Sequence, residues 1–223
     1  MLSADKKVVI FDLDGTILDT IEDIAGAVNR ASATFGYPSR TVSEIQSFLG
    51  NGSLVLMRRT LGEDADDEIW KKVRTVFRTE YQTGMYNHTK PYEGIKELLS
   101  ELRALGATVM VVTNKDDRSA VPMIEHFFGD LVQHCRGVRG DNDRKPNPQV
   151  TLELLESLGY TPNQALLVGD GMADLEVSKN AGIEYIPVGY GYTASEKLFA
   201  NCGKTPAKDV SELRRILLSY FEK

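Results

Sequence analysis

Short apolar runs with the length of buried strands recur along the chain. Four of them, rich in β-branched residues, cover positions 8–11, 107–112, 165–168 and 185–188. A fifth, ambiguous run lies within 131–138. Since none of the four alternates between apolar and polar positions, we expect strands that are buried on both faces of a parallel sheet.

Helical patterns separate these runs. Residues 92–105 place leucine and isoleucine side chains on one face, and similar patterns cover 149–158 and 175–181. Each stretch is followed by a glycine, which is typical of a helix C-terminus. The succession of strand, helix, glycine and strand predicts an α/β fold with an open sheet.

The segment 20–85 departs from this alternation of strands and helices, because it contains helical patterns only. These patterns lie at 21–35, 42–49, 53–61 and 66–81. Glycines separate them, and no strand-like run occurs between them. A block of helices inserted after the first strand indicates a second, small domain. We therefore predict a core domain made of 1–19 and 86–223, and an all-helical domain at 20–85.

Composition and charge narrow the classes of function. Of the 223 residues, 42% are hydrophobic and 26% charged, which is typical of a globular protein. The net charge of -6, without a run of Lys and Arg, argues against a nucleic-acid partner. The run at 8–11 is too short for a signal peptide or a membrane span, and Cys135 and Cys202 form no CxxC pair. We expect a cytoplasmic monomer or homodimer without a membrane partner.

Acidic side chains follow two of the expected strands. Asp12 and Asp14 come directly after one, and Asp170 and Asp174 come after another. In open α/β sheets ligands bind at the carboxyl ends of the strands, so we expect the two pairs to lie together. Clustered carboxylates need a cation, and Mg²⁺ suits oxygen ligands beside a phosphate. Residues 12–16 alone also fit a turn or a helix cap, and the second pair favours a metal site.

Two further segments carry groups that suit phosphate oxygens. Thr113 and Asn114 follow the run at 107–112 and offer a hydroxyl and an amide. Lys145 precedes Pro146-Asn147-Pro148, an extended segment that would hold its ammonium in place. Each segment alone would also fit an ordinary turn, and a single lysine is usually solvated. The prediction therefore depends on the joint position of Thr113, Asn114 and Lys145.

These segments resemble the four motifs of the haloacid dehalogenase-like hydrolase superfamily, in the family's order. Asp12-Leu13-Asp14-Gly15-Thr16 resembles the first motif, Thr113 the second, Lys145 the third, and 169–174 the fourth. The resemblance implies a Rossmann-like core, with a parallel sheet flanked by helices. It also implies a helical cap domain inserted between the first two motifs, where 20–85 lies.

The resemblance further implies a Mg²⁺-dependent phosphatase for a small phosphorylated metabolite. Asp12 is the expected nucleophile, forming an aspartyl-phosphate, and Asp14 the expected acid and base. The expected ligands of Mg²⁺ are Asp12, the backbone carbonyl of Asp14, Asp170 and Asp174. The phosphoryl oxygens are expected to bind to Thr113, Asn114 and Lys145, with Gly15 and Thr16 allowing close approach of the backbone.

The helical segment offers a hint about the substrate. Gly50-Asn51-Gly52, followed by a helix with Arg58 and Arg59, resembles a segment of phosphoglycolate phosphatases. Backbone N–H groups near Gly50 and Gly52, with Arg58, would then bind 2-phosphoglycolate. The alternative is a glycine-rich helix break with two solvated arginines.

Other activities of the same superfamily fit the sequence. A sugar-phosphate phosphatase, a pyrophosphatase and a phosphoglucomutase-like enzyme would use the same motifs, and a catalytically silent binding protein is a further alternative. A dehydrogenase is set aside because no GxGxxG follows the first strand. The sequence does not decide what residues 190–200 contact.

Overall fold

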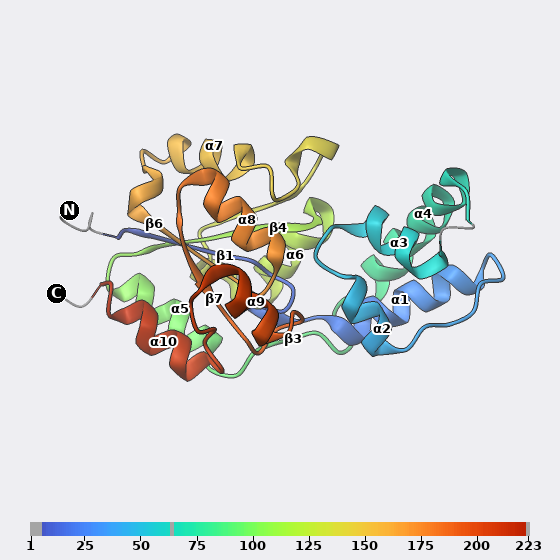
Figure 1. Cartoon of the computed structure of the whole chain (residues 1–223), viewed down its shortest axis with the longest axis horizontal. Helices are drawn as coiled ribbons and strands as arrows, with labels where there is room; N and C mark the ends of the chain where they lie inside the picture. Colours follow the sequence, from blue (N-terminus) through green and yellow to red (C-terminus); the bar gives the residue numbers. More distant parts are fainter. Residues whose placement is uncertain (1–5, 63–64, 222–223) are drawn as a thin grey trace.

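A parallel sheet forms the centre of the fold. The computed structural model describes residues 6–62 and 65–221. Five strands lie in the order β5-β4-β1-β6-β7 and all pair in parallel (Figure 1). Their bounds are β1 Val8–Phe11, β4 Thr108–Asp116, β5 His134–Val138, β6 Ala165–Gly169 and β7 Glu184–Pro187. The predicted α/β class is confirmed, and the ambiguous run within 131–138 contains β5.

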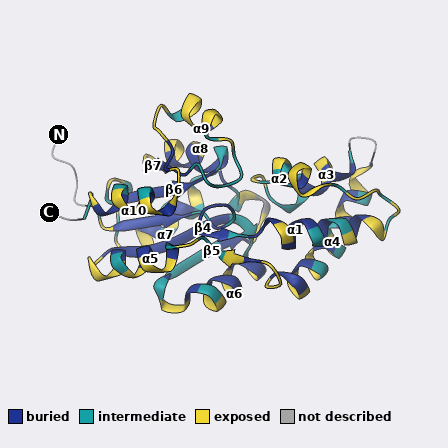
Figure 2. Cartoon of the chain, turned by 90° about the horizontal axis from the view of Figure 1, so that it is seen from below, coloured by how far each residue is buried: buried dark blue, intermediate teal, exposed yellow. Residues whose placement is uncertain are grey.

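The sheet is buried on both faces, which explains the missing alternation in the sequence. Val9 and Phe11 point into one hydrophobic cluster, and Val8 and Ile10 into another. Successive side chains of a strand face opposite sides, so both sets must be apolar. In Figure 2 the buried residues accordingly run along the strands.

Helices cover the two faces of the sheet (Figure 1). One face packs against α5 Ile95–Ala104, α6 Asp117–Phe128 and α10 Val210–Leu218. The other packs against α7 Gln149–Ser157 and α8 Met172–Ala181, with α9 Ser195–Cys202 beside them. Short 3-10 turns lie at Gly129–Leu131, Asp141–Asp143 and Pro162–Gln164. The sequence analysis did not anticipate α6, α9 or α10.

The segment between β1 and β4 forms a lobe of four helices beside the sheet (Figure 1). Its helices are α1 Ile21–Ala33, α2 Val42–Phe48, α3 Ser53–Leu61 and α4 Asp67–Gly84. Thr41 caps α2 with a capping box, and Asp66 caps α4 by accepting from the Ile69 N–H. We call this lobe the cap. Its division from the core at 19/20 and 85/86 remains a prediction.

Two short strands join the cap to the core. β2 Leu18–Asp19 pairs antiparallel with β3 Lys90–Pro91, so the outgoing and returning chains lie side by side. Asp23 in α1 strengthens this joint, since its buried carboxylate accepts from the backbone N–H groups of His88 and Thr89 at 2.8–3.0 Å. A buried carboxylate with several backbone donors is well satisfied. The polypeptide therefore enters and leaves the cap through two segments that lie side by side.

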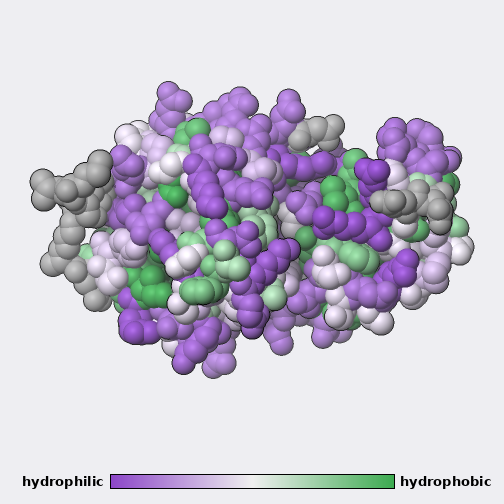
Figure 3. Space-filling model, in the orientation of Figure 1, coloured by the Kyte–Doolittle hydropathy of each residue, from purple (hydrophilic) through white to green (hydrophobic). Residues whose placement is uncertain are grey.

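The surface is mostly polar on the face shown in Figure 3, where hydrophobic side chains gather only in small groups. Among the described residues, no helix has the length and apolar character needed to cross a membrane.

Candidate active site

The carboxyl ends of three neighbouring strands meet at one cavity of about 510 Å³. Asp12 follows β1, Thr113 lies near the end of β4, and Asp170 follows β6. β1 pairs with both β4 and β6, and this brings the three residues together although they are far apart in sequence. The cap supplies the opposite wall through Ile24, Leu49, Gly50, Asn51, Gly52, Leu56, Arg59, Phe77, Arg78 and Tyr81.

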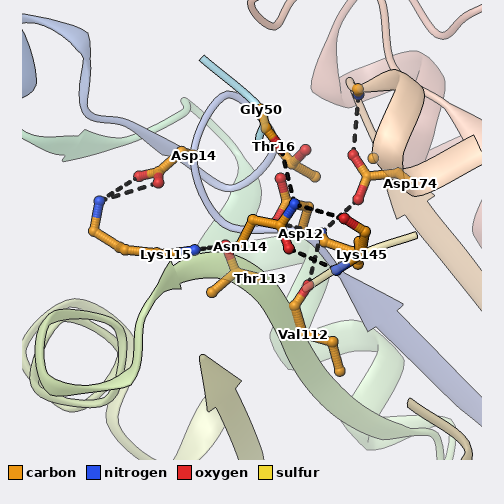
Figure 4. Close-up of polar contacts among 12 residues, drawn as sticks. Asp12, Asp14, Thr16, Gly50, Val112, Thr113, Asn114, Lys115, Lys145 and Asp174 are labelled. Carbon is orange, nitrogen blue, oxygen red and sulfur yellow. Dashed lines mark hydrogen bonds and ion pairs between the residues drawn. The ribbon is translucent and has the colours of Figure 1, made fainter. Parts of the chain in front are cut away.

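Lys145 lies at the floor of the cavity and is 4% exposed. Its ammonium donates to Asp12 Oδ1 at 2.8 Å, to Asp174 Oδ1 at 2.5 Å and to the carbonyl of Val112 at 2.9 Å (Figure 4). Burial by itself would lower the pKa of Lys145. The carboxylates of Asp12 and Asp174 outweigh this effect and hold the pKa above its ordinary value, so the ammonium stays charged.

Three carboxylates cluster beside this ammonium, and two of them, Asp12 and Asp174, contact it. One oxygen from each of Asp12, Asp170 and Asp174 lies within 4.8 Å of the others. Burial raises the pKa of Asp170 to about 7, and the charges of Asp12 and Asp174 add to the rise. Burial also raises the pKa of Asp174, against the opposing effect of Lys145. When all three are ionised, one ammonium faces three negative charges, so this donor set of hard oxygens fits a divalent cation.

Asp14 lies apart from that cluster and has its own partners. Lys115 donates to both carboxylate oxygens at 2.8 and 3.0 Å, and the Thr20 hydroxyl donates to Oδ1 at 2.7 Å. The Lys115 ammonium also lies 4.4 Å from the ring centroid of Tyr81, in α4 of the cap. No role for Lys115 was predicted from the sequence. Its place directly after Thr113 and Asn114 was the available signal.

Asn114 lines the cavity, but its amide is already engaged. Its Nδ2 donates to the carbonyl of Gly50 at 2.8 Å and to that of Lys145 at 3.1 Å, and its Oδ1 accepts from the Lys145 N–H at 2.7 Å. The side chain thus ties β4 both to the Lys145 segment and to the cap. The expected role in phosphate binding is untested, and the observed contacts favour a structural one.

Gly15 and Thr16 lie next to the Asp170 carboxylate and are not among the described residues that line the cavity. The Thr16 hydroxyl donates to Asp170 Oδ1 at 2.9 Å. Gly15 has φ 82°, and a Cβ there would lie 2.5 Å from Asp170 Oδ2. Only glycine combines that backbone conformation with such a close approach.

The two arginines of α3 point in different directions. The Arg58 guanidinium lies 4.6 Å from the ring centroid of Trp70 and is absent from the described lining of the cavity. Arg59 lines the cavity, and its Nη1 donates to the carbonyl of Phe48 at 2.9 Å. Consecutive helix residues project about 100° apart, and here the residue stacked on Trp70 points away while its neighbour lines the cavity. Arg58 is the residue predicted from the sequence to bind substrate, whereas Arg59 is the one that lines the cavity.

A loop after β7 also reaches the cavity. Tyr192 lines it, and its backbone N–H donates to Asp170 Oδ2 at 2.6 Å. The sequence analysis left the contacts of this region open, because nothing in Tyr190-Gly191-Tyr192 resembles a site motif. The signal that existed was two tyrosines flanking a glycine just after a strand end.

Comparison with known proteins extends this picture. A family model described as haloacid dehalogenase-like hydrolase matches residues 9–188. The phosphoglycolate phosphatase of Vibrio vulnificus is 30% identical over 225 residues, covering 98% of this chain and 99% of the relative. That of Pseudomonas putida is 30% identical over 217 residues, covering 95% and 78%.

Solved structures with a similar fold also include predicted phosphatases. A predicted phosphoglycolate phosphatase from Haemophilus somnus superimposes with a TM-score of 0.88 at 26% identity, over 96% of this chain and 99% of that one. A predicted phosphatase from Clostridium acetobutylicum gives a TM-score of 0.86 at 25% identity, over 97% and 100%. The likeness therefore includes the inserted helices as well as the sheet.

Proposed function

Because the chain belongs to the haloacid dehalogenase-like hydrolase family, we propose that it hydrolyses 2-phosphoglycolate with Mg²⁺, through an aspartyl-phosphate on Asp12. That it is a phosphoric monoester hydrolase with a small phosphorylated substrate follows from the family and from its phosphoglycolate phosphatase relatives. The observation that carries the proposal is the buried Lys145 ammonium between Asp12 and Asp174, at the floor of the cavity.

In the first step, a carboxylate oxygen of Asp12 attacks phosphorus, and the bond from phosphorus to the ester oxygen breaks. Asp14 gives a proton to the leaving oxygen, which departs as an alcohol. We expect the Lys145 ammonium and the Thr113 hydroxyl, which both line the cavity, to stabilise the negative charge on the phosphoryl oxygens together with backbone N–H groups.

In the second step, Asp14 takes a proton from water, and the resulting hydroxide attacks the aspartyl-phosphate. The bond between phosphorus and the Asp12 oxygen breaks, which restores the carboxylate and releases inorganic phosphate. Lys115 and Thr20 both donate to the Asp14 carboxylate, and we expect these hydrogen bonds to orient it in the two steps.

Asp12, Asp170 and Asp174 would hold the metal, since their oxygens cluster and carry an excess of negative charge. When bound, Mg²⁺ neutralises part of the charge that otherwise opposes the approach of a phosphate dianion to a carboxylate. The hydrogen bonds from Thr16 and Tyr192 to Asp170, and from Gly171 to Asp174, fix the two buried carboxylates beforehand.

The substrate assignment depends on the cap and on the named relatives. Most cations at the cavity are already paired: Lys145 with Asp12 and Asp174, Lys115 with Asp14, and Arg78 with Asp116. Like Lys197, which also lines the cavity, Arg59 forms no ion pair with an acidic residue in the described part of the chain. Its guanidinium is therefore suited to the carboxylate of 2-phosphoglycolate.

The test is phosphate release from a panel of 2-phosphoglycolate, sugar phosphates and pyrophosphate, with Mg²⁺ and with a chelator. We expect Mg²⁺-dependent release that is strongest on 2-phosphoglycolate. Release spread over the sugar phosphates would overturn the substrate, and release in the presence of chelator would overturn the metal. Conversion of a sugar 1-phosphate to its 6-phosphate would identify a mutase instead.

A pair of cap variants tests the role of Arg59. We expect Arg59→Ala to raise the KM for 2-phosphoglycolate about tenfold, because a charged hydrogen bond contributes about 1.5–3 kcal/mol and solvent screens part of it. The KM for phenyl phosphate, which lacks a carboxylate, should change little. Steady-state kinetics of Arg58→Ala provide the matched comparison, and an equal or larger effect there would return the role to Arg58.

A further inference from the structure

Tyr192 contacts three parts of the molecule at once. Its backbone N–H donates to Asp170 Oδ2 at 2.6 Å, in the core. Its carbonyl accepts from Gln46 Nε2 at 3.4 Å, in helix α2 of the cap. Its phenol reaches the connection between them, where the Thr20 N–H donates to the phenol oxygen at 2.7 Å.

The phenol also lies in a chain of hydroxyl groups that ends at Asp14. The Thr20 hydroxyl is 2.7 Å from Asp14 Oδ1 and 3.2 Å from the phenol oxygen. An ionised carboxylate can only accept, so toward an ionised Asp14 the Thr20 hydroxyl must be the donor. Its oxygen is then free to accept from the phenol O–H, for which Asp19 Oδ1 at 3.3 Å is the competing acceptor.

We propose that Tyr192 is a positioning residue that fixes the orientation of Asp14 through Thr20. The inference rests on the proposed function, in which Asp14 moves the proton. Thr20 is fully buried and stands immediately before α1, where the chain enters the cap. The phenol of Tyr192 forms hydrogen bonds with both the N–H and the hydroxyl of Thr20, and these keep the Thr20 hydroxyl directed at Asp14. Hydrogen bonds in such a chain strengthen one another.

The loop is packed closely enough to hold the phenol in place. A Cβ on Gly191 would lie 2.3 Å from Asp170 Cβ and 2.4 Å from the Gly15 carbonyl oxygen, so no other residue fits there without movement. The Tyr190 hydroxyl donates to the Thr16 carbonyl at 3.0 Å and fastens the other end of the loop. Burial, with the Asp14 charge, raises the pKa of Tyr192, which keeps its O–H available as a donor.

The primary test is Tyr192→Phe, which removes the hydroxyl and leaves the ring and the backbone N–H. We expect kcat to fall about tenfold, because loss of a group that orients a catalytic side chain reduces activity roughly 10- to 100-fold. The KM should change less than twofold. The rise in Tm produced by Mg²⁺ should match that of the wild type, since the N–H to Asp170 remains.

A double-mutant cycle shows whether the phenol acts through Thr20. Thr20→Val removes the hydroxyl that donates to Asp14, and Thr20→Ser keeps one. If the phenol acts through Thr20, Tyr192→Phe should cause little further loss of kcat in the Thr20→Val background. Thr20→Ser should retain most of the activity, and this also checks that the position tolerates substitution.

Tyr190→Phe is the matched control, because it removes a phenol hydrogen bond from the same loop without touching Thr20 or Asp14. The inference is overturned if Tyr192→Phe leaves kcat unchanged, if only the KM changes, if the Tyr192 and Thr20 effects multiply, or if Tyr190→Phe lowers kcat equally. A wild-type protein that releases no phosphate would instead overturn the proposed function, so the two failures are distinguishable.

Discussion

Replacing Asp12 with Asn should abolish phosphate release while leaving the fold intact. The amide has nearly the shape of the carboxylate but is a far weaker nucleophile, so we expect kcat to fall by about four to six orders of magnitude. Lys145 keeps Asp174 and the Val112 carbonyl as partners, so the buried ammonium is not left alone. Circular dichroism and the Tm should therefore stay close to those of the wild type.

Two further measurements sharpen this prediction. Acid quenching during turnover of radiolabelled substrate should trap label on the wild type and none on Asp12→Asn. Asp12→Glu keeps the charge but moves it by one methylene, and it should also be nearly inactive, because attack depends on position. A rate in Asp12→Asn above one hundredth of the wild type would remove this residue as the nucleophile.

Replacing Lys145 with Met should have the second large effect, on stability as well as activity. The substitution leaves Asp12 and the buried Asp174 without the ammonium that contacts both, in a cluster that also holds Asp170. Breaking a buried ion pair by removing one partner destabilises a protein by about 3–5 kcal/mol. The loss of one charged donor at the phosphoryl site should lower kcat by roughly 10²- to 10³-fold.

The distinguishing feature of this variant is its response to Mg²⁺. In urea unfolding, Mg²⁺ should stabilise Lys145→Met more than the wild type, since the cation then relieves a larger excess of negative charge. Lys115→Met is the matched control, because it also removes a cavity ammonium, but one paired with Asp14 and not with the three-carboxylate cluster. Equal stabilisation of the two variants by Mg²⁺ would contradict this account of the cluster.

Much of the core could be predicted from the sequence, because its signals are local. A strand buried on both faces must be apolar throughout, so β1, β6 and most of β4 stand out as runs. The end of β4 does not, since residues 113–116 are polar, and 114–116 are also partly exposed where they approach the cavity. The acidic pairs after β1 and β6 could likewise be predicted to lie at one site, because both follow strand ends directly.

The contacts that sequence reasoning missed depend on distant pairings. The β2–β3 joint involves two residues in each strand, which is too short to form a pattern. The sequence gives no reason to prefer Arg58 or Arg59 as the residue that faces the cavity. The packing of Arg58 in α3 against Trp70 decides between them. Tyr192 lies 172 residues after Thr20, and no local feature connects the two. Side-chain direction and long-range contact were the missing information.

The paired strands at the base of the cap have a consequence for how freely the insertion can vary. Leu18 and Pro91 are neighbours, so the core polypeptide leaves and resumes at nearly the same point in space. For the core, everything between them is a closed loop, and doubling the length of a flexible loop adds only about 0.6 kcal/mol of closure entropy. Apart from Thr20 and Asp23, whose contacts orient Asp14 and strengthen the joint, substitutions and length changes between these two residues should therefore alter which substrates the enzyme accepts long before they prevent its core from folding.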